Sequence, residues 1–109
     1  MPKIKVTYFE VYGRADPIRM MLHHSKTPFE DCFVTFEQWK GMKGTPAAGE
    51  FQCLPIVCVN GKDHQQTGPI LRSMGQRLGY YHGDNETEAY WADFSFECWN
   101  DMLGGFGKA

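Results

Sequence analysis

Leu54-Pro55-Ile56-Val57-Cys58-Val59-Asn60-Gly61-Lys62 is the stretch that decides the fold. Its first part is apolar and predicts a strand over residues 54–59. Pro55 must stand at the start of that strand, because proline has no N–H to give to a sheet ladder. Asn60-Gly61 is the pair most typical of a two-residue hairpin turn. The stretch therefore predicts a second strand over residues 62–66, antiparallel to the first.

Upstream of this hairpin, the pattern predicts two strands separated by a helix. Residues 4–9 alternate between apolar and polar, which places Ile4, Val6 and Tyr8 on one face of a strand. Asp16-Pro17 is typical of a helix start, with Asp as the cap, and Thr27-Pro28 ends that helix. Residues 29–34 form the next predicted strand. Because a helix joins the two strands, we expect them to be parallel.

The remaining elements complete the fold class. A short helix is predicted around residues 37–40, and Thr67 is expected to cap a helix that Gly79 ends. The apolar stripe of that helix is Ile70, Leu71, Met74 and Leu78. The order is strand, helix, strand, short helix, hairpin, helix. This predicts an α/β domain of thioredoxin-like βαβαββα type, with a mixed four-stranded sheet.

The last segment is predicted to be a helix of a second domain. Asn85 and Glu88 resemble a capping box, and the helix is expected over residues 86–103. Its aromatic side chains do not lie on one face, so the helix requires several neighbours. They are Tyr90, Trp91, Phe94, Phe96 and Trp99. We expect residues 1–82 to form the first domain, and residues 83–109 to be a linker and the first helix of a truncated all-α domain. A subunit interface, or a helix folded back on the sheet, is the alternative.

Composition bounds the function. The chain has 109 residues and a net charge of −2, which argues against the clustered basic side chains of a nucleic-acid footprint. No apolar run reaches the length of a membrane span, and no signal peptide is visible. The cysteines form no C-x-x-C pair and no zinc spacing; they are Cys32, Cys53, Cys58 and Cys98. The expectation is a cytoplasmic protein with reduced thiols and no metal.

Three places in the first domain suit a small thiol peptide. A cis Leu54-Pro55 bond would turn the Leu54 backbone outward to pair with an extended peptide, although a trans edge-strand proline is the alternative. Gln66 and Thr67 precede a helix N-terminus, which suits a ligand carboxylate, although Thr67 could be a cap only. Tyr8 ends the first strand, where its phenol could donate a hydrogen bond to a thiolate and so lower the pKa of the thiol. Taken by itself, Tyr8 is better explained as a core aromatic than as a thiol-activating group.

Together these residues carry a resemblance to a known family. The segments concerned are Val6-Thr7-Tyr8-Phe9, Gly13-Arg14-Ala15, Ile18-Arg19, Trp39, Leu54-Pro55-Ile56, Asn60-Gly61-Lys62, Gln66-Thr67 and Ile70-Leu71-Arg72. They resemble the N-terminal domain of a cytosolic glutathione transferase, and most closely the sigma class, which includes haematopoietic prostaglandin D synthases and S-crystallins. The resemblance covers residues 3–82 and continues more weakly into the helix at 86–103.

The resemblance implies a role for each matching residue. Tyr8 would activate the glutathione sulfur, with Arg14 supporting the thiolate. The glutathione-binding set would be Tyr8, Trp39, Lys43, Cys53, Leu54, Pro55, Gln66, Thr67 and Asp101. Within it, Trp39 and Lys43 would reach the glycine carboxylate, the Leu54 backbone would pair with the cysteine residue ahead of a cis Pro55, and Gln66 and Thr67 would hold the γ-glutamyl end. Asp101, or Asn100 beside it, would reach across a dimer.

The chain departs from the family pattern at three points. Thr67 replaces the usual Ser and keeps its hydroxyl. Cys53 replaces the usual Gln or Lys, so one contact with the glycine carboxylate is expected to be lost. The family's helical domain, which forms most of the electrophile pocket and much of the dimer contact, is nearly all missing.

The resemblance implies that glutathione is the co-substrate. The reaction would be attack of its thiolate on a soft hydrophobic electrophile, as in detoxification, or an isomerisation such as prostaglandin H to D, in a homodimer without a metal. A glutaredoxin-like enzyme is a rival, but it needs a cysteine near residues 13–17, and none is there. A second rival is a binding or structural protein of S-crystallin type.

Overall fold

The computed structural model describes residues 3–11 and 13–107, and the side chains among them up to residue 104. It separates into two compact units, one ending at Ile70 and one starting at Leu71. The elements along the chain are β1 (Ile4–Phe9), α1 (Asp16–His24), β2 (Glu30–Val34), α2 (Phe36–Met42), the 3₁₀ helix η1 (Pro46–Ala48), β3 (Ile56–Val59), β4 (Lys62–Gln65), α3 (Thr67–Leu78) and α4 (Glu86–Gly107). The predicted boundary after residue 82 stays a prediction.

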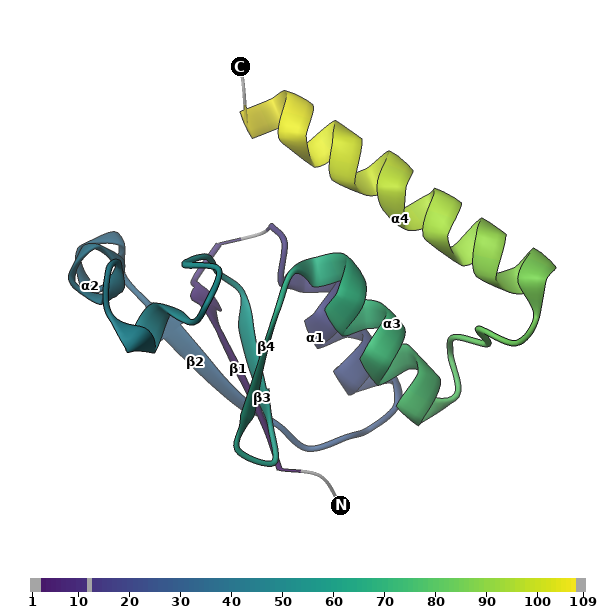
Figure 1. The fold of residues 1–109 in the computed structure, drawn as a ribbon, viewed down its shortest axis with the longest axis horizontal. Helices are drawn as coiled ribbons and strands as arrows, with labels where there is room; N and C mark the ends of the chain where they lie inside the picture. The colour runs from purple at the N-terminus through teal and green to yellow at the C-terminus, as the bar shows by residue number, and fades with distance from the viewer. Residues whose placement is uncertain (1–2, 12, 108–109) are drawn as a thin grey trace. The chain divides into compact units, whose positions relative to one another are not determined.

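The four strands of the first unit form one sheet in the order β2-β1-β3-β4 (Figure 1). β1 and β2 are parallel, whereas β3 is antiparallel to both β1 and β4. The predicted strand directions are therefore confirmed. β3 begins at Ile56, two residues later than predicted, because Leu54 and Pro55 precede the ladder rather than join it.

The hairpin turn at Asn60-Gly61 has the predicted form. Both residues have positive φ, 52° and 84°, which matches the twist of the flanking strands. Asn60 is also tied to the start of β1, since its N–H donates to the Lys3 carbonyl and its side-chain oxygen accepts from the Lys3 N–H, both at 2.8 Å. The turn thus fixes the register of β3 and β4, with Val59 opposite Lys62.

The core of the first unit lies on one face of the sheet. Ile4, Val6 and Tyr8 are buried, as the alternation in β1 predicts. Ile18 and Leu22 of α1, which Figure 1 shows beside the sheet, are fully buried. Because this core holds the end of β1 against α1, it fixes the place of the Tyr8 ring.

The start of α1 differs from the expectation. Ala15 rather than Asp16 occupies the cap position, and no side chain caps the helix there. The Asp16 carboxylate instead accepts a hydrogen bond from the Gly13 N–H at 2.9 Å, while the Asp16 N–H donates to the Gly13 carbonyl. The carboxylate therefore closes the loop between β1 and α1, a use that the capping rule does not distinguish from a cap.

The second unit holds most of α3 and all of α4. Asn85 accepts from the Glu88 N–H at 3.2 Å, which confirms it as the cap of α4. Asp93 of α4 accepts from Arg72 at 3.1 Å and from the Tyr81 hydroxyl at 3.2 Å. Several α4 aromatics are exposed, among them Tyr90, Trp91 and Phe94, which contact one another. Among the described residues, we find no helix with the length and apolarity needed to cross a membrane.

These contacts predict an alkaline titration for Tyr81. Its pKa lies above the ordinary value of 10.0 because desolvation, the hydrogen bond to Asp93 and the charge of Asp93 all disfavour the phenolate. We expect Asp93→Asn to lower the pKa of Tyr81 towards the ordinary value, since the charge is then lost. An NMR titration of the labelled tyrosine rings checks this, with Tyr90 as the reference signal. An unchanged Tyr81 midpoint in the variant would contradict the assignment.

Candidate functional site

Tyr8 lies at the end of β1 with its ring almost fully buried, at 9% exposure. Its hydroxyl oxygen accepts a hydrogen bond from the Arg14 backbone N–H at 3.2 Å. An accepted bond leaves the hydroxyl's own proton available to a further acceptor. Gly13 makes this approach possible, because a Cβ on Gly13 would lie 2.6 Å from the Tyr8 hydroxyl oxygen. The two readings of Tyr8, core aromatic and hydrogen-bond donor, are therefore compatible in one side chain.

The Arg14 peptide joins the end of β1 to the start of α3. Its N–H donates to Tyr8, and its carbonyl accepts from the Thr67 hydroxyl at 3.1 Å. Thr67 is the first residue of α3 rather than the residue before it, and the Gln66 carbonyl accepts the first helical bond, from Ile70. Thr67 is thus not the cap we expected, since its hydroxyl donates to a distant carbonyl. Tyr8, Arg14 and Thr67 form one connected group.

Leu54-Pro55 is a cis peptide bond, as the resemblance implies. Leu54 is half-buried and Pro55 is buried. Among the described residues, we find no hydrogen bond that uses the Leu54 backbone N–H or C=O. A main-chain donor and acceptor are therefore present just before β3, which is the arrangement that an extended peptide ligand requires.

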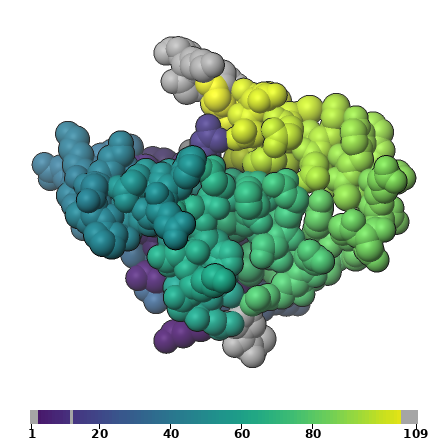
Figure 2. Space-filling view, in the orientation of Figure 1, coloured from purple at the N-terminus to yellow at the C-terminus, as the bar shows by residue number. Residues whose placement is uncertain are grey.

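The other predicted residues of the first unit lie on α2 or before α3. Trp39 of α2 is half-buried and meets the ring of Phe9, which follows Tyr8, edge-on at 6.5 Å. Lys43 follows α2 directly and is exposed. Gln66 is exposed, with a φ of 74°, and its amide nitrogen lies 3.9 Å from the Cys53 sulfur. In Figure 2, α2 and the segment after it form one continuous surface in blue to teal.

Asp101 lies on α4 in the second unit, where its side chain is exposed. Its role across a dimer stays a prediction. Cys53, in the first unit, is half-buried, and burial raises the pKa of its thiol. Its sulfur is therefore protonated at neutral pH, so it does not supply a thiolate of its own. Within the described segments no three His, Cys, Asp or Glu side chains meet as a metal site; the expectation of no metal stays untested.

Sequence reasoning missed Arg19. Its guanidinium lies 5.8 Å from the centre of the Tyr8 ring, and its Nε donates to Asp31 at 3.0 Å. A cation over a phenol ring is attracted by the π face. The sequence does place Arg19 on α1, next to the core residue Ile18. No spacing rule, however, predicts that an arginine on a helix will contact a tyrosine on a strand eleven residues earlier. Arg19 adds positive charge on the ring side of Tyr8.

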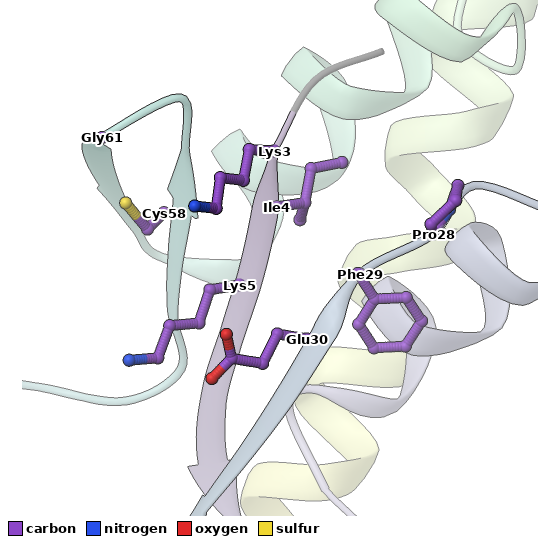
Figure 3. Close-up of a pocket in the computed structure, with 8 residues that line it drawn as sticks. All are labelled: Lys3, Ile4, Lys5, Pro28, Phe29, Glu30, Cys58 and Gly61. Carbon is purple, nitrogen blue, oxygen red and sulfur yellow. The ribbon is translucent and has the colours of Figure 1, made fainter.

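A hollow lies at the opposite end of β1 from Tyr8. It has a volume of about 740 Å³ and is lined by side chains from the starts of β1 and β2, with Cys58 of β3 (Figure 3). Lys3, Lys5 and Glu30 supply its charges. None of the predicted site residues lines it. The candidate site is therefore the group around Tyr8 and not this hollow.

The chain is similar in sequence to curated proteins of nematodes and insects. It is 36% identical over 100 residues to a glutathione S-transferase P of Caenorhabditis elegans, which is 91% of this chain and 46% of that protein. It is 32% identical over 106 residues to a glutathione S-transferase of Anopheles gambiae, which is 97% of this chain and 48% of that protein. These relatives are glutathione S-transferases. The chain spans about half the length of the curated relatives it matches, and no protein-family model matches it.

Solved structures show the same similarity in three dimensions. A Nu-class glutathione S-transferase of Haemonchus contortus matches 95% of this chain and 49% of its own, with a TM-score of 0.80 and 31% identity. A prostaglandin synthase D of Nilaparvata lugens matches 97% of this chain and 51% of its own, with a TM-score of 0.82 and 33% identity. The predicted fold class is confirmed: the chain has the thioredoxin-like N-terminal fold of glutathione S-transferases, with part of their helical domain.

Proposed function

We propose that this chain is the glutathione-binding part of a glutathione transferase, in which Tyr8 activates the thiol. The observation that carries the proposal is the Tyr8 hydroxyl. It accepts from the Arg14 N–H at 3.2 Å and keeps its own proton to donate. The similarity to glutathione S-transferases supports the choice of ligand.

The chemistry follows from the ionisation of a thiol. A free cysteine-type thiol has a pKa of about 8.5, so only a few per cent is thiolate at neutral pH. A hydrogen bond from Tyr8 to the sulfur favours the thiolate and lowers the pKa of the thiol. The thiolate then attacks an electrophilic carbon, the S–C bond forms, and the leaving group departs with its electron pair. The thiol proton is released to water before the attack.

The remaining residues position the peptide in this proposal. The Leu54 backbone pairs with the cysteine residue of glutathione, and Gln66 and Thr67 hold the γ-glutamyl end at the start of α3. Trp39 and Lys43 reach the glycine carboxylate, and Asp101 of a partner subunit reaches the γ-glutamyl amine. Arg14 supports Tyr8 through its backbone N–H, which donates to the Tyr8 hydroxyl oxygen.

The finer features are also proposals. We assign the chain to a sigma-like class, cytoplasmic and homodimeric, with a hydrophobic electrophile as second substrate. The similarity to a structure described as a prostaglandin synthase D favours an isomerase of that type as one form of the activity. The domain boundary at residues 82 and 83 belongs to the same proposal, because the family's helical domain would begin there.

Two measurements test the proposal in order. Calorimetric titration of the chain with glutathione measures binding, and a conjugation assay with a soluble aryl halide measures turnover. Binding together with turnover supports the transferase. Binding without turnover favours the alternative, a glutathione-binding or structural protein of S-crystallin type. The exposed aromatic side chains of α4 are the observation behind this alternative. No binding of glutathione would overturn both.

A further inference from the structure

Gln65, the last residue of β4, fixes the segment that leads into Leu54. Its amide makes three hydrogen bonds to backbone groups of residues 48–53, and its nitrogen also lies 3.8 Å from the Cys53 sulfur. The amide nitrogen donates to the Ala48 carbonyl at 3.0 Å and to the Cys53 carbonyl at 2.9 Å. The amide oxygen accepts from the Phe51 N–H at 3.0 Å. Both donor hydrogens and the oxygen of the side chain are thus used.

Gly49 shows how closely this side chain is held. A Cβ on Gly49 would lie 2.6 Å from the amide carbon of Gln65 and 2.8 Å from its nitrogen. The φ of Gly49 is +76°, a conformation that favours glycine. The backbone of the segment therefore wraps onto the amide at van der Waals distance, and only glycine permits the approach.

The bond to Cys53 has a consequence for Leu54. The Cys53 carbonyl and the Leu54 N–H belong to one peptide unit, which is planar, and in a trans unit the two groups point in opposite directions. The Cys53–Leu54 unit is trans, whereas the Leu54-Pro55 bond after it is cis. When Gln65 holds the carbonyl, it therefore holds the N–H pointing the other way. A donor bonded at one end of a peptide also polarises the other end.

We propose that Gln65 is a positioning residue that aims the Leu54 N–H at the main chain of the bound peptide. It makes no contact with the ligand in this proposal; it acts through the Cys53–Leu54 peptide. The inference rests on the proposed function, because that function supplies the peptide that Leu54 pairs with. In the proposed function Gln66, the neighbouring residue, holds the γ-glutamyl end, so the two adjacent glutamines have different roles.

The test compares Gln65→Met with Gln76→Met. Methionine keeps the length and volume of glutamine but has no amide, and Gln76 is an exposed residue of α3 that controls for the exchange itself. Amide hydrogen exchange by NMR, without ligand, is expected to accelerate in Q65M at Phe51, whose N–H loses its acceptor, and to stay unchanged at Val57 and Val59. The amide signal of Leu54 is expected to shift, because its peptide unit loses the bond that holds the Cys53 carbonyl. Because the two strand amides report the global fold, the comparison separates a local release from general destabilisation.

Binding gives the second readout. We expect the Kd of glutathione to rise roughly tenfold in Q65M, the effect of losing about one well-aligned hydrogen bond. If the chain turns over, KM for glutathione rises by the same factor, while kcat and KM for the electrophile stay near their original values. Gln65→Asn, which keeps the amide but withdraws it by one methylene, is expected to act in the same direction and serves if Q65M does not fold.

The outcomes separate this inference from the proposed function. Suppose that the unchanged protein binds glutathione. If both variants, Q65M and Q65N, then bind glutathione within twofold of the same affinity, Gln65 does not position Leu54. If the unchanged protein does not bind glutathione, the proposed function fails. The NMR measurements without ligand then decide the rest: faster exchange at Phe51 together with a shifted Leu54 amide signal in the variants supports a positioning role towards another ligand, and an unchanged Leu54 signal overturns it.

Discussion

Tyr8→Phe is expected to lower the turnover of glutathione with an aryl halide about a hundredfold at neutral pH, the usual cost of removing one preorganised donor from a developing or bound anion. The variant removes a single oxygen and leaves the buried ring in place. The glutathione Kd should change little, since Leu54, Gln66 and Thr67 carry the peptide in the proposed site. A steady-state conjugation assay together with calorimetric binding measures both quantities.

The matched control is Tyr90→Phe, which makes the same chemical change on an exposed ring of α4. We expect it to leave turnover unchanged. Circular dichroism of both variants guards against a folding defect, because Tyr8→Phe also leaves the Arg14 N–H without its acceptor. If Y8F turns over glutathione at the original rate while it folds and binds, Tyr8 is only a core aromatic and the activation proposal is wrong.

The same variant has a pH signature. A thiol bound next to a phenol donor ionises below its free pKa. The profile of kcat/KM for the electrophile, measured at saturating glutathione, should therefore rise in the unchanged protein at a pH lower than about 8.5. Without the donor, the thiol pKa returns upward, and the midpoint of the profile should move to higher pH by roughly one to two pH units. Measurement of kcat/KM for the electrophile at saturating glutathione, across the neutral and alkaline range, tests the direction in which the midpoint moves. A lower rate at every pH with an unmoved midpoint would point to misplacement of the ligand instead.

Local patterns account for the part of the fold that could be predicted. The alternation around Val6 placed Tyr8 on the buried face, and Asn60-Gly61 set the hairpin, because both signals depend on neighbours in the chain. The positions of element ends were less accurate. α4 extends to Gly107, past residue 103 where we expected it to end, since the glycines that follow weaken a helix without forbidding it.

The candidate site likewise contains residues that could be predicted from the sequence and residues that could not. Tyr8, Leu54 and Thr67 could be chosen from the sequence because they belong to short motifs. Gln65 could not, since its three partners lie 12 to 17 residues away along an irregular segment, and glutamine at a strand end is usually solvated. The direction of the Thr67 hydroxyl was missed for a similar reason: its acceptor on Arg14 is 53 residues away. Backbone partners of this kind become visible only when the chain is folded.

Gly13→Ala is expected to reduce turnover by a factor of about 10 to 100, nearly as much as loss of the hydroxyl, because a donor moved by about an ångström loses most of its effect. The added Cβ would lie 2.6 Å from the Tyr8 hydroxyl oxygen and 3.4 Å from the ring carbon that carries it. Such a contact cannot persist, so the ring must turn or the loop must move. The expected effect is therefore steric displacement of the hydroxyl.

Gly104→Ala is the matched control, since a Cβ on that α4 glycine meets nothing within 4 Å and alanine suits a helix better. It should keep full turnover. The double variant Gly13→Ala with Tyr8→Phe gives the sharper result. If the alanine acts only by displacing the hydroxyl, it adds little once the hydroxyl is gone, and the two losses are strongly non-additive. Fully additive losses would mean that Gly13 serves the site by another route, and the Tyr8–Gly13 contact would then not explain its need for glycine.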